Sequence, residues 1–123
     1  MKVPLQHIAH VRAGDKGNTW NCAVIAYNDE LYPLLKEQLT AEVFKRFYGE
    51  IIQGEVERFP VDGLSAINFV AHDALGGGAS RTLALDNYGK ALSAAILALE
   101  LEVPDRLGNS LRNYRPGDRG RTT

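Results

Sequence analysis

The sequence has little of what would assign it to a specialised class. One cysteine among 123 residues, Cys22, excludes an internal disulfide and fits a reducing compartment. It lies among apolar residues and is expected to be inert core. No apolar run approaches the roughly 20 residues of a membrane span, and the first residues lack the apolar stretch of a signal peptide. We therefore expect a cytoplasmic protein with no membrane partner.

Net charge is also small, at −1, so no global field attracts nucleic acid. Hydrophobic residues make up 45% of the chain and charged residues 24%, as is ordinary for a single globular domain of this length. The charge is uneven, because residues 106–123 hold five arginines and one aspartate, a net of +4. The sequence predicts one domain over residues 1–104. An arginine-rich tail, over 105–123, has a composition typical of segments without fixed structure, and contact with a neighbouring subunit is the alternative that would hold it in place.

Apolar patterns predict a mixture of strands and helices. Strands are expected where apolar residues alternate or run together, at residues 5–12, 21–27, 56–61, 64–72, 81–85 and 100–103. Helices are expected where they recur at helical spacing, from Asn28 or Asp29 to Leu39, from a Thr40 cap to Ile51, and from Asp86 or Asn87 to Leu99. This order predicts an α+β two-layer sandwich, with one mixed or antiparallel sheet and helices on one face.

The expected strand at 21–27 is apolar on both faces, whereas a strand with one wet face alternates. One face of the sheet is expected to pack against the helices. In a chain this short, little remains to cover the other face. We therefore expect the protein to form a homo-oligomer, with a second copy as the cover.

Three consecutive glycines, Gly76, Gly77 and Gly78, follow the strand that contains Asn68 and precede Arg81. Successive backbone N–H groups in such a turn can form a concave anion site. A loop that merely joins two elements explains the same glycines, and the phosphate-loop pattern Gly-x-x-x-x-Gly-Lys-Ser/Thr is absent. Both interpretations stay open. On the first, Asn68, the three glycines and Arg81 bind the anion.

A second polar stretch runs from Arg12 to Asn18 and is expected to be a turn. Arg12 would make a bidentate contact with a carboxylate or phosphate, and Lys16 would add a point charge. Asp15 would orient Lys16 or act as a base. In the alternative interpretation this is a solvated hairpin turn. The first makes Arg12, Lys16 and Asn18 binding residues and Asp15 a catalytic one.

The three histidines do not predict a metal site. His7 and His10 are three apart, so on a strand they face opposite sides, and no His-x-x-x-His motif is present. We expect neither a metal nor another cofactor. His72 shares a strand face with Asn68, and Asp73 follows it; a neighbouring carboxylate would favour its charged form. His72 and Asp73 are therefore candidate acid–base residues, against the plainer alternative of packed or half-exposed positions.

Two stretches, taken together, resemble a known domain. The first is Arg12-Ala13-Gly14-Asp15-Lys16-Gly17-Asn18 with the strand after it, and the second runs from Asn68-Phe69-Val70 through the glycines to Gly89-Lys90-Ala91. In this order they resemble the small C-terminal domain of acyclic terpene utilisation AtuA-like proteins, over roughly residues 5–103. The resemblance implies a ferredoxin-like fold and a link to bacterial breakdown of branched isoprenoid acids as CoA thioesters. It carries over no catalytic residue.

Three functions fit this sequence. The first is an oligomeric subunit or accessory domain that pairs with a separate AtuA-like large chain in acyl-CoA or branched carboxylic acid catabolism, as the resemblance implies. The second is an autonomous small enzyme with an anion or acyl-CoA site beside the glycines. The third is a regulatory or nucleic-acid-binding module acting through the basic tail, which the lack of an aromatic-studded basic face disfavours. We expect the first, and whether the chain is an enzyme stays open.

Overall fold

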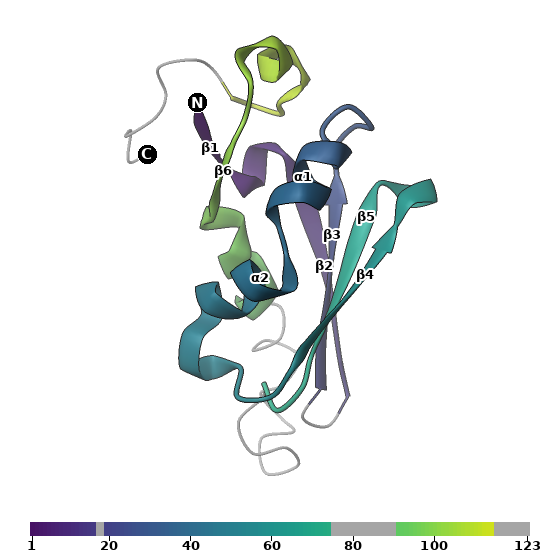
Figure 1. The fold of residues 1–123 in the computed structure, drawn as a ribbon, viewed down its shortest axis with the longest axis vertical. Helices are drawn as coiled ribbons and strands as arrows, with labels where there is room; N and C mark the ends of the chain where they lie inside the picture. Colours follow the sequence, from purple (N-terminus) through teal and green to yellow (C-terminus); the bar gives the residue numbers. More distant parts are fainter. Residues whose placement is uncertain (17–18, 75–90, 115–123) are drawn as a thin grey trace.

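The structure, a computed structural model, describes residues 1–16, 19–74 and 91–114. A four-stranded antiparallel sheet has the strand order β2-β3-β5-β4. Its strands are β2 (Ala9–Lys16), β3 (Thr19–Ala26), β4 (Val56–Val61) and β5 (Ala66–Ala71). A separate antiparallel pair is formed by β1 (Lys2–Pro4) and β6 (Glu100–Glu102). Helices lie on one side of the four-stranded sheet (Figure 1), so the predicted α+β two-layer sandwich is confirmed.

The helical layer comprises α1 (Tyr32–Gln38), α2 (Ala41–Tyr48), residues 91–95 and the short helix η5 (Ile96–Ala98). Pro33 lies in the first turn of α1, where a missing N–H breaks no helical bond. As predicted, α2 begins after Thr40, whose hydroxyl accepts a hydrogen bond from the Val43 amide at 3.1 Å. The predicted cap of α1 is wrong, because the Asn28 side chain instead accepts from the Glu30 amide in a local turn.

Two predicted boundaries at the start of the chain are wrong. Residues Leu5–His7 form a short helix, η1, rather than the beginning of a strand. The Leu5 amide donates to the carbonyl of Leu99, so a distant segment fixes this turn. β2 then continues to Lys16, through residues that the composition assigned to a turn. The strand is longer than predicted because each residue from Ala9 to Lys16 pairs with β3.

The β4–β5 connection also differs from the expectation. The dipeptide Asp62-Gly63 is typical of a tight hairpin, whereas η3 (Asp62–Leu64) joins the strands and Ser65 follows in a left-handed conformation, with φ at 50°. β5 therefore begins at Ala66, two residues later than predicted. Pro60 lies on an edge strand, since β4 ends the sheet order, and an edge strand tolerates its missing N–H.

The core lies between the sheet and the helices. Alternate residues of β3, beginning with Trp20 and Cys22, are buried there. Phe44 of α2 stacks on Phe69 of β5, with ring centroids 4.2 Å apart. Helical spacing would also place Phe47 on the buried stripe of α2, but Phe47 is 37% exposed and only Phe44 and Tyr48 of this helix are buried. The buried side of the sheet is therefore held mainly by aromatic packing.

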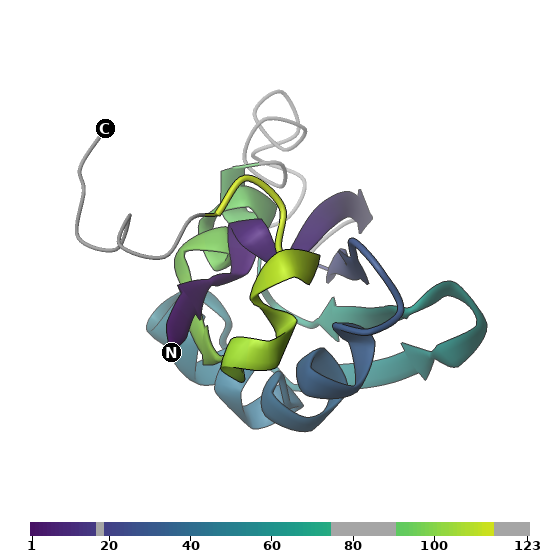
Figure 2. The same cartoon turned by 90° about the horizontal axis from the view of Figure 1, so that it is seen from above.

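Part of the expected tail belongs to the folded domain. η6 (Asp105–Ser110) buries Leu107, and Leu111 follows it into the core. Tyr114 packs against His7 with ring centroids 5.1 Å apart. Figures 1 and 2 place η6 at the end of the molecule opposite the Lys16 end of β2. The expectation of a structureless tail is therefore wrong for residues 105–114. The other segments predicted at 81–85, 86–90 and 115–123 lie outside the described residues.

Candidate functional site

The two motif-bearing stretches meet at one end of the sheet. Asp15 pairs with Trp20, and Trp20 pairs in turn with Ala71, the last residue of β5. The end of β2 and the residues after β5 therefore lie at the same end of the molecule (Figure 1). Several predicted site residues lie outside the described part, and these are Asn18, Gly76, Gly77, Gly78 and Arg81, with the side chains of Asp15 and Lys16.

The backbone after β5 is held by the residues that precede β4. The His72 amide donates to the Glu55 carbonyl, and the Gly54 amide to the His72 carbonyl, both at 3.0 Å. Gly54 is needed because a Cβ there would lie 2.6 Å from the His72 oxygen. Asp73 follows with φ at 52°, a left-handed conformation that aspartate adopts more readily than most residues. The chain thus turns sharply just before the glycine-rich stretch.

The sheet face opposite the helices, here called the open face, carries a polar track. Asn21 donates from Nδ2 to the Oδ1 of Asn68 at 2.5 Å. Gly14 lies across from Asn21, and a Cβ at Gly14 would be 3.0 Å from the Asn21 Oδ1. Arg12 is exposed and pairs with Ala23, which pairs in turn with Asn68. The predicted residues Arg12 and Asn68 therefore share one row of this face.

Asn21 was missed by the sequence reasoning. It lies in a strand that is otherwise apolar, and that isolated amide was the available signal. Its partner Asn68 is 47 positions away in the chain, so only strand pairing brings the two amides together.

His72 also reaches the open face, and its partner comes from another strand. Its Nε2 lies 2.7 Å from the Oε1 of Glu57 on β4. Both side chains are about half exposed, so the pair orients the ring more than it stabilises the fold. Glu57, which the sequence did not single out, is therefore the carboxylate that His72 contacts. The sequence pattern that could have identified Glu57 is its place in the β4 strand, where it points to the face opposite to that of its neighbours Val56 and Arg58.

Arg12, midway along the edge strand β2, and His72, just beyond the inner strand β5, are well separated on the open face. Their Cα atoms are separated by two strand spacings of about 4.8 Å and four residues of about 3.4 Å, or about 17 Å in all. One small anion does not span that distance. A ligand that touches both side chains must be extended, such as an acyl-CoA thioester or a protein surface.

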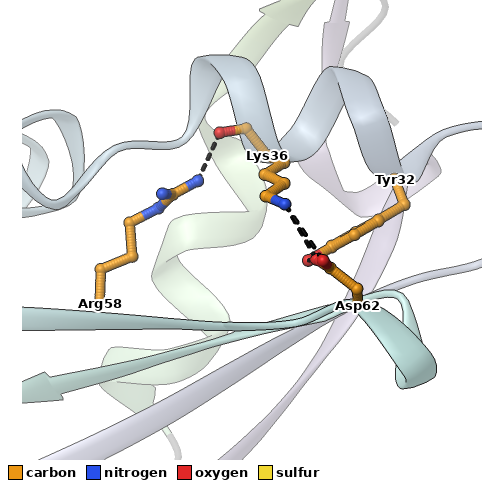
Figure 3. Close-up of polar contacts among 4 residues, drawn as sticks. All are labelled: Tyr32, Lys36, Arg58 and Asp62. Atoms are coloured by element: carbon orange, nitrogen blue, oxygen red, sulfur yellow. Dashed lines mark hydrogen bonds and ion pairs between the residues drawn. The ribbon is translucent and has the colours of Figure 1, made fainter.

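A further polar cluster, which the sequence did not predict, joins α1 to the β4–β5 hairpin (Figure 3). The Tyr32 hydroxyl donates to Oδ1 of Asp62 at 2.6 Å, and Lys36 Nζ lies 3.0 Å from the same oxygen. Arg58 donates to the carbonyls of Leu39 and Lys36, at the C-terminal end of α1. The spacing of Tyr32 and Lys36, one helical turn apart, was the available sequence signal.

The electrostatics of this cluster favour a structural role. Hydrogen bonds from Tyr32 and then Lys36 lower the pKa of Asp62. Burial, together with the hydrogen bond to Asp62, raises the pKa of Tyr32 to about 12. Asp62 is thus ionised and Tyr32 protonated across the neutral range, and neither exchanges a proton readily. We interpret the cluster as a clamp between the two layers.

Cys22 is buried, as expected of an inert core residue. Burial raises the pKa of its thiol to about 12, and Ser93 lies within hydrogen-bond reach of it. Trp20 donates from Nε1 to the Ser93 hydroxyl at 3.1 Å, which ties residues 91–95 to the sheet. A thiol in this state is a poor nucleophile at neutral pH.

A wide cavity of about 730 Å³ lies away from both motifs, between α1, β6 and η6. Its polar lining includes Glu30, Glu37 and Glu102. Glu102 already contacts the Met1 amino group at 3.4 Å. Nothing in this acidic hollow points to a particular ligand.

Two further findings concern the described part of the chain. Among residues 1–16, 19–74 and 91–114, no three or more His, Cys, Asp and Glu side chains are grouped as a metal site requires. In the same part, each helix is too short or too polar to cross a membrane.

Comparison with known proteins identifies the domain. The model of the AtuA ferredoxin-like domain family matches residues 3–102. No curated protein and no solved structure matches the chain. The matched region begins within β1 and ends where β6 ends. The chain therefore belongs to the AtuA ferredoxin-like domain family.

Proposed function

We propose that this chain is an oligomeric accessory subunit that pairs with an AtuA-like large chain in the catabolism of branched carboxylic acids carried as CoA thioesters. The observation that carries the proposal is the open face. No described helix or strand covers it (Figure 1), although Ile25, Val61 and Phe59 lie close together there, and Val61 and Phe59 are 38% and 47% exposed. Contiguous apolar surface of this kind marks an interaction site.

The polar residues of the open face suit an anionic group. Arg12 is exposed, and its guanidinium can bind a carboxylate or phosphate by donating two parallel hydrogen bonds. Asn68 adds an amide group in the same row as Arg12, and its partner Asn21 adds one in the next row. An acyl-CoA thioester offers both phosphates and an extended chain, which matches the separation of Arg12 from His72.

The proposal is tested by native mass spectrometry of the protein purified gently from its own host. We expect a complex that contains this chain and a larger AtuA-like chain. The same two chains, produced together, should copurify in a defined ratio. Release of only this chain, with neither a large partner nor a retained acyl-CoA, would contradict the proposal.

Ligand binding is tested separately by calorimetry with a branched acyl-CoA, such as isovaleryl-CoA. Arg12→Ala should weaken binding about tenfold, the loss expected for one charge-assisted contact. Lys45→Ala is the matched control, because Lys45 is an exposed cation on α2 in the helical layer. Equal losses in both variants would show that binding depends on net charge alone.

A second candidate function is autonomous catalysis, favoured by one observation. The His72–Glu57 pair and the left-handed Asp73 lie immediately before the glycine-rich stretch. Such backbone conformations gather at functional sites. Turnover of an acyl-CoA by the isolated chain, abolished in His72→Gln and Asp73→Asn with the fold intact, would favour this candidate over the accessory role.

A further inference from the structure

We propose that a second copy of this chain covers the open face, related to the first by a two-fold axis that runs along the strands. In this arrangement β2 of each copy lies over β4 of the other. The inference rests on the proposed function, since it names the first partner of the oligomeric subunit and the way that partner is held. Arg12 takes part both in this contact and in the proposed ligand contact, so the second copy and an acyl-CoA occupy the open face alternately.

One end of the open face is apolar enough for two copies to bury. Ile25 of β3 lies in one row with Ala66 of β5 and Val61 of β4, and Phe59 lies two residues from Val61 on the same face of β4. Ile25 is partly exposed in the single chain, and Val61 and Phe59 are exposed. Removing them from water is the general driving force for such an association.

Charge is distributed unequally between the two edges of this face. Along β2, His10 and Arg12 are exposed, and the Arg112 guanidinium lies 4.1 Å from the ring centre of Tyr27. Tyr27 itself stacks on His10. On the opposite edge strand, β4, the open face carries Glu57. One edge is therefore basic and the other acidic.

This asymmetry selects between the two ways in which a two-fold axis can bring the open faces together. An axis across the strands lays β2 over β2, so that the arginine-bearing edges of both copies meet. An axis along the strands lays β2 over β4, so that the basic edge of each copy meets the acidic edge of the other. Like charges disfavour the first arrangement, and opposite charges favour the second.

The strand register gives the contacts of the favoured arrangement. Arg12, Ala23, Asn68 and Phe59 form one continuous row across the sheet. A two-fold axis along the strands leaves each row at the same position in the strand direction. In the second copy, the residues of that row run across the sheet in the opposite order. Arg12 of one copy then lies over Phe59 of the second copy, where a guanidinium and a ring attract each other, and Glu57 of the second copy is two residues away. Symmetry makes each contact twice.

The size of the face predicts a dimer of modest strength. Four strands about 4.8 Å apart and six paired residues about 3.4 Å apart give a face of about 19 by 20 Å. Two such faces bury on the order of 800 to 1,000 Å² in total, near the lower limit for a specific interface. We therefore expect a dimer whose population depends on protein concentration.

The test is sedimentation velocity of the purified chain over roughly 1 to 500 µM, which yields the dimer Kd. We expect Arg12→Glu to weaken the dimer at least tenfold and Glu57→Arg to do the same. The double variant should recover to within about threefold of the unchanged protein, because the opposite charges meet again. Glu57→Gln removes the charge that faces His72 without reversing it, and so separates the effect of charge reversal from the loss of the His72 contact. Lys45→Glu makes the same charge change as Arg12→Glu, but on α2, and should leave the Kd unchanged.

Two results would overturn the inference. One is a chain that stays monomeric across the whole concentration range. The other is a dimer in which the double variant binds no more tightly than either single variant, as expected with β2 over β2, because each edge then still meets its own charge in the second copy. These results are independent of the proposed function. If the chain is a monomer that still copurifies with a large chain, only the proposed second copy is contradicted. If it is a dimer with the expected charge pattern but has neither a large partner nor a retained acyl-CoA, only the proposed accessory role is contradicted.

Discussion

Cys22 and Ala23 are neighbours on β3, yet they lie in two different environments. Cys22 is fully buried between the sheet and the helices. Ala23 faces the other way, onto the open face between Arg12 and Asn68. The same alternation separates buried Phe69 from Asn68 on β5. The comparison shows that each strand turns one set of side chains to the core and the other to the open face, where we propose that recognition takes place.

The two faces also differ in how their side chains are held. On the covered face, Trp20, Phe44, Tyr48 and Phe69 touch one another through ring contacts at 4.2 to 5.5 Å. On the open face, the Asn21–Asn68 and His72–Glu57 contacts link neighbouring strands and leave Phe59 exposed. A substitution on the first face is therefore expected to change folding, and one on the second to change binding.

The largest difference between the two faces is expected in the free energy of unfolding, when two phenylalanines on adjacent strands are replaced. Phe69→Ala leaves a cavity against Phe44 and should reduce the free energy of unfolding by about 3–5 kcal/mol. Phe59→Ala, on the open face, should cost less than about 1 kcal/mol. Urea denaturation at low protein concentration measures both. Similar losses in the two variants would mean that the open face is also part of the core.

A similar contrast is expected in the reactivity of neighbouring thiols. Burial raises the pKa of Cys22 to about 12, so at pH 8 its thiolate fraction is about three orders of magnitude below that of an exposed cysteine. Iodoacetamide should label native Cys22 at least a hundredfold more slowly than a cysteine introduced by Ala23→Cys. Peptide mass spectrometry distinguishes the two sites. Rapid labelling of native Cys22 would show that the covered face opens.

A smaller effect is expected where the covering helix begins. Thr40→Ala removes the hydrogen bond to the Val43 amide and should lower the free energy of unfolding by about 1 kcal/mol. Thr40→Ser keeps an accepting hydroxyl and is the control. The dimer Kd should stay unchanged in both variants, since the cap lies in the helical layer. A change in Kd would link the two faces.

The smallest effect concerns the clamp between α1 and the β4–β5 hairpin. The pKa of Asp62 is lowered in the folded chain, so its contribution to stability is present above the ordinary aspartate value of 3.8 and is lost as pH falls through the lower folded value. Between about pH 5 and pH 2, Asp62→Asn should therefore lose less stability than the unchanged protein. Tyr32→Phe should reduce this pH dependence too. Equal acid sensitivity in all three would exclude the clamp.

Much of the fold could be predicted because local patterns agree with the tertiary environment. The strand at Val56–Val61 was predicted with its observed bounds, and the Thr40 cap was located correctly. The failure at Leu5–His7 has a clear cause. The alternation of Leu5 and His7 suits a strand, but the Leu5 amide bonds to Leu99 instead, 94 residues away. No local pattern contains that contact.

The candidate site was less predictable than the fold. Arg12, Asn68 and His72 were identified from the two motifs, and the alternation on β5 correctly placed Asn68 and His72 on one face. Asn21 and Glu57 were not identified, since each gains its partner only when strands pair. The glycines and Arg81 remain predictions, because they lie outside the described residues.

The sequence by itself determined the α+β class and the family, because these follow from periodicity and from short motifs along the chain. The tertiary structure decided which residues share the open face, which carboxylate His72 contacts and how far Arg12 lies from it. The physical reason is register. Hydrogen bonding between β2, β3, β5 and β4 aligns residues that are distant in the chain, and a shift of one residue would turn each side chain to the other face.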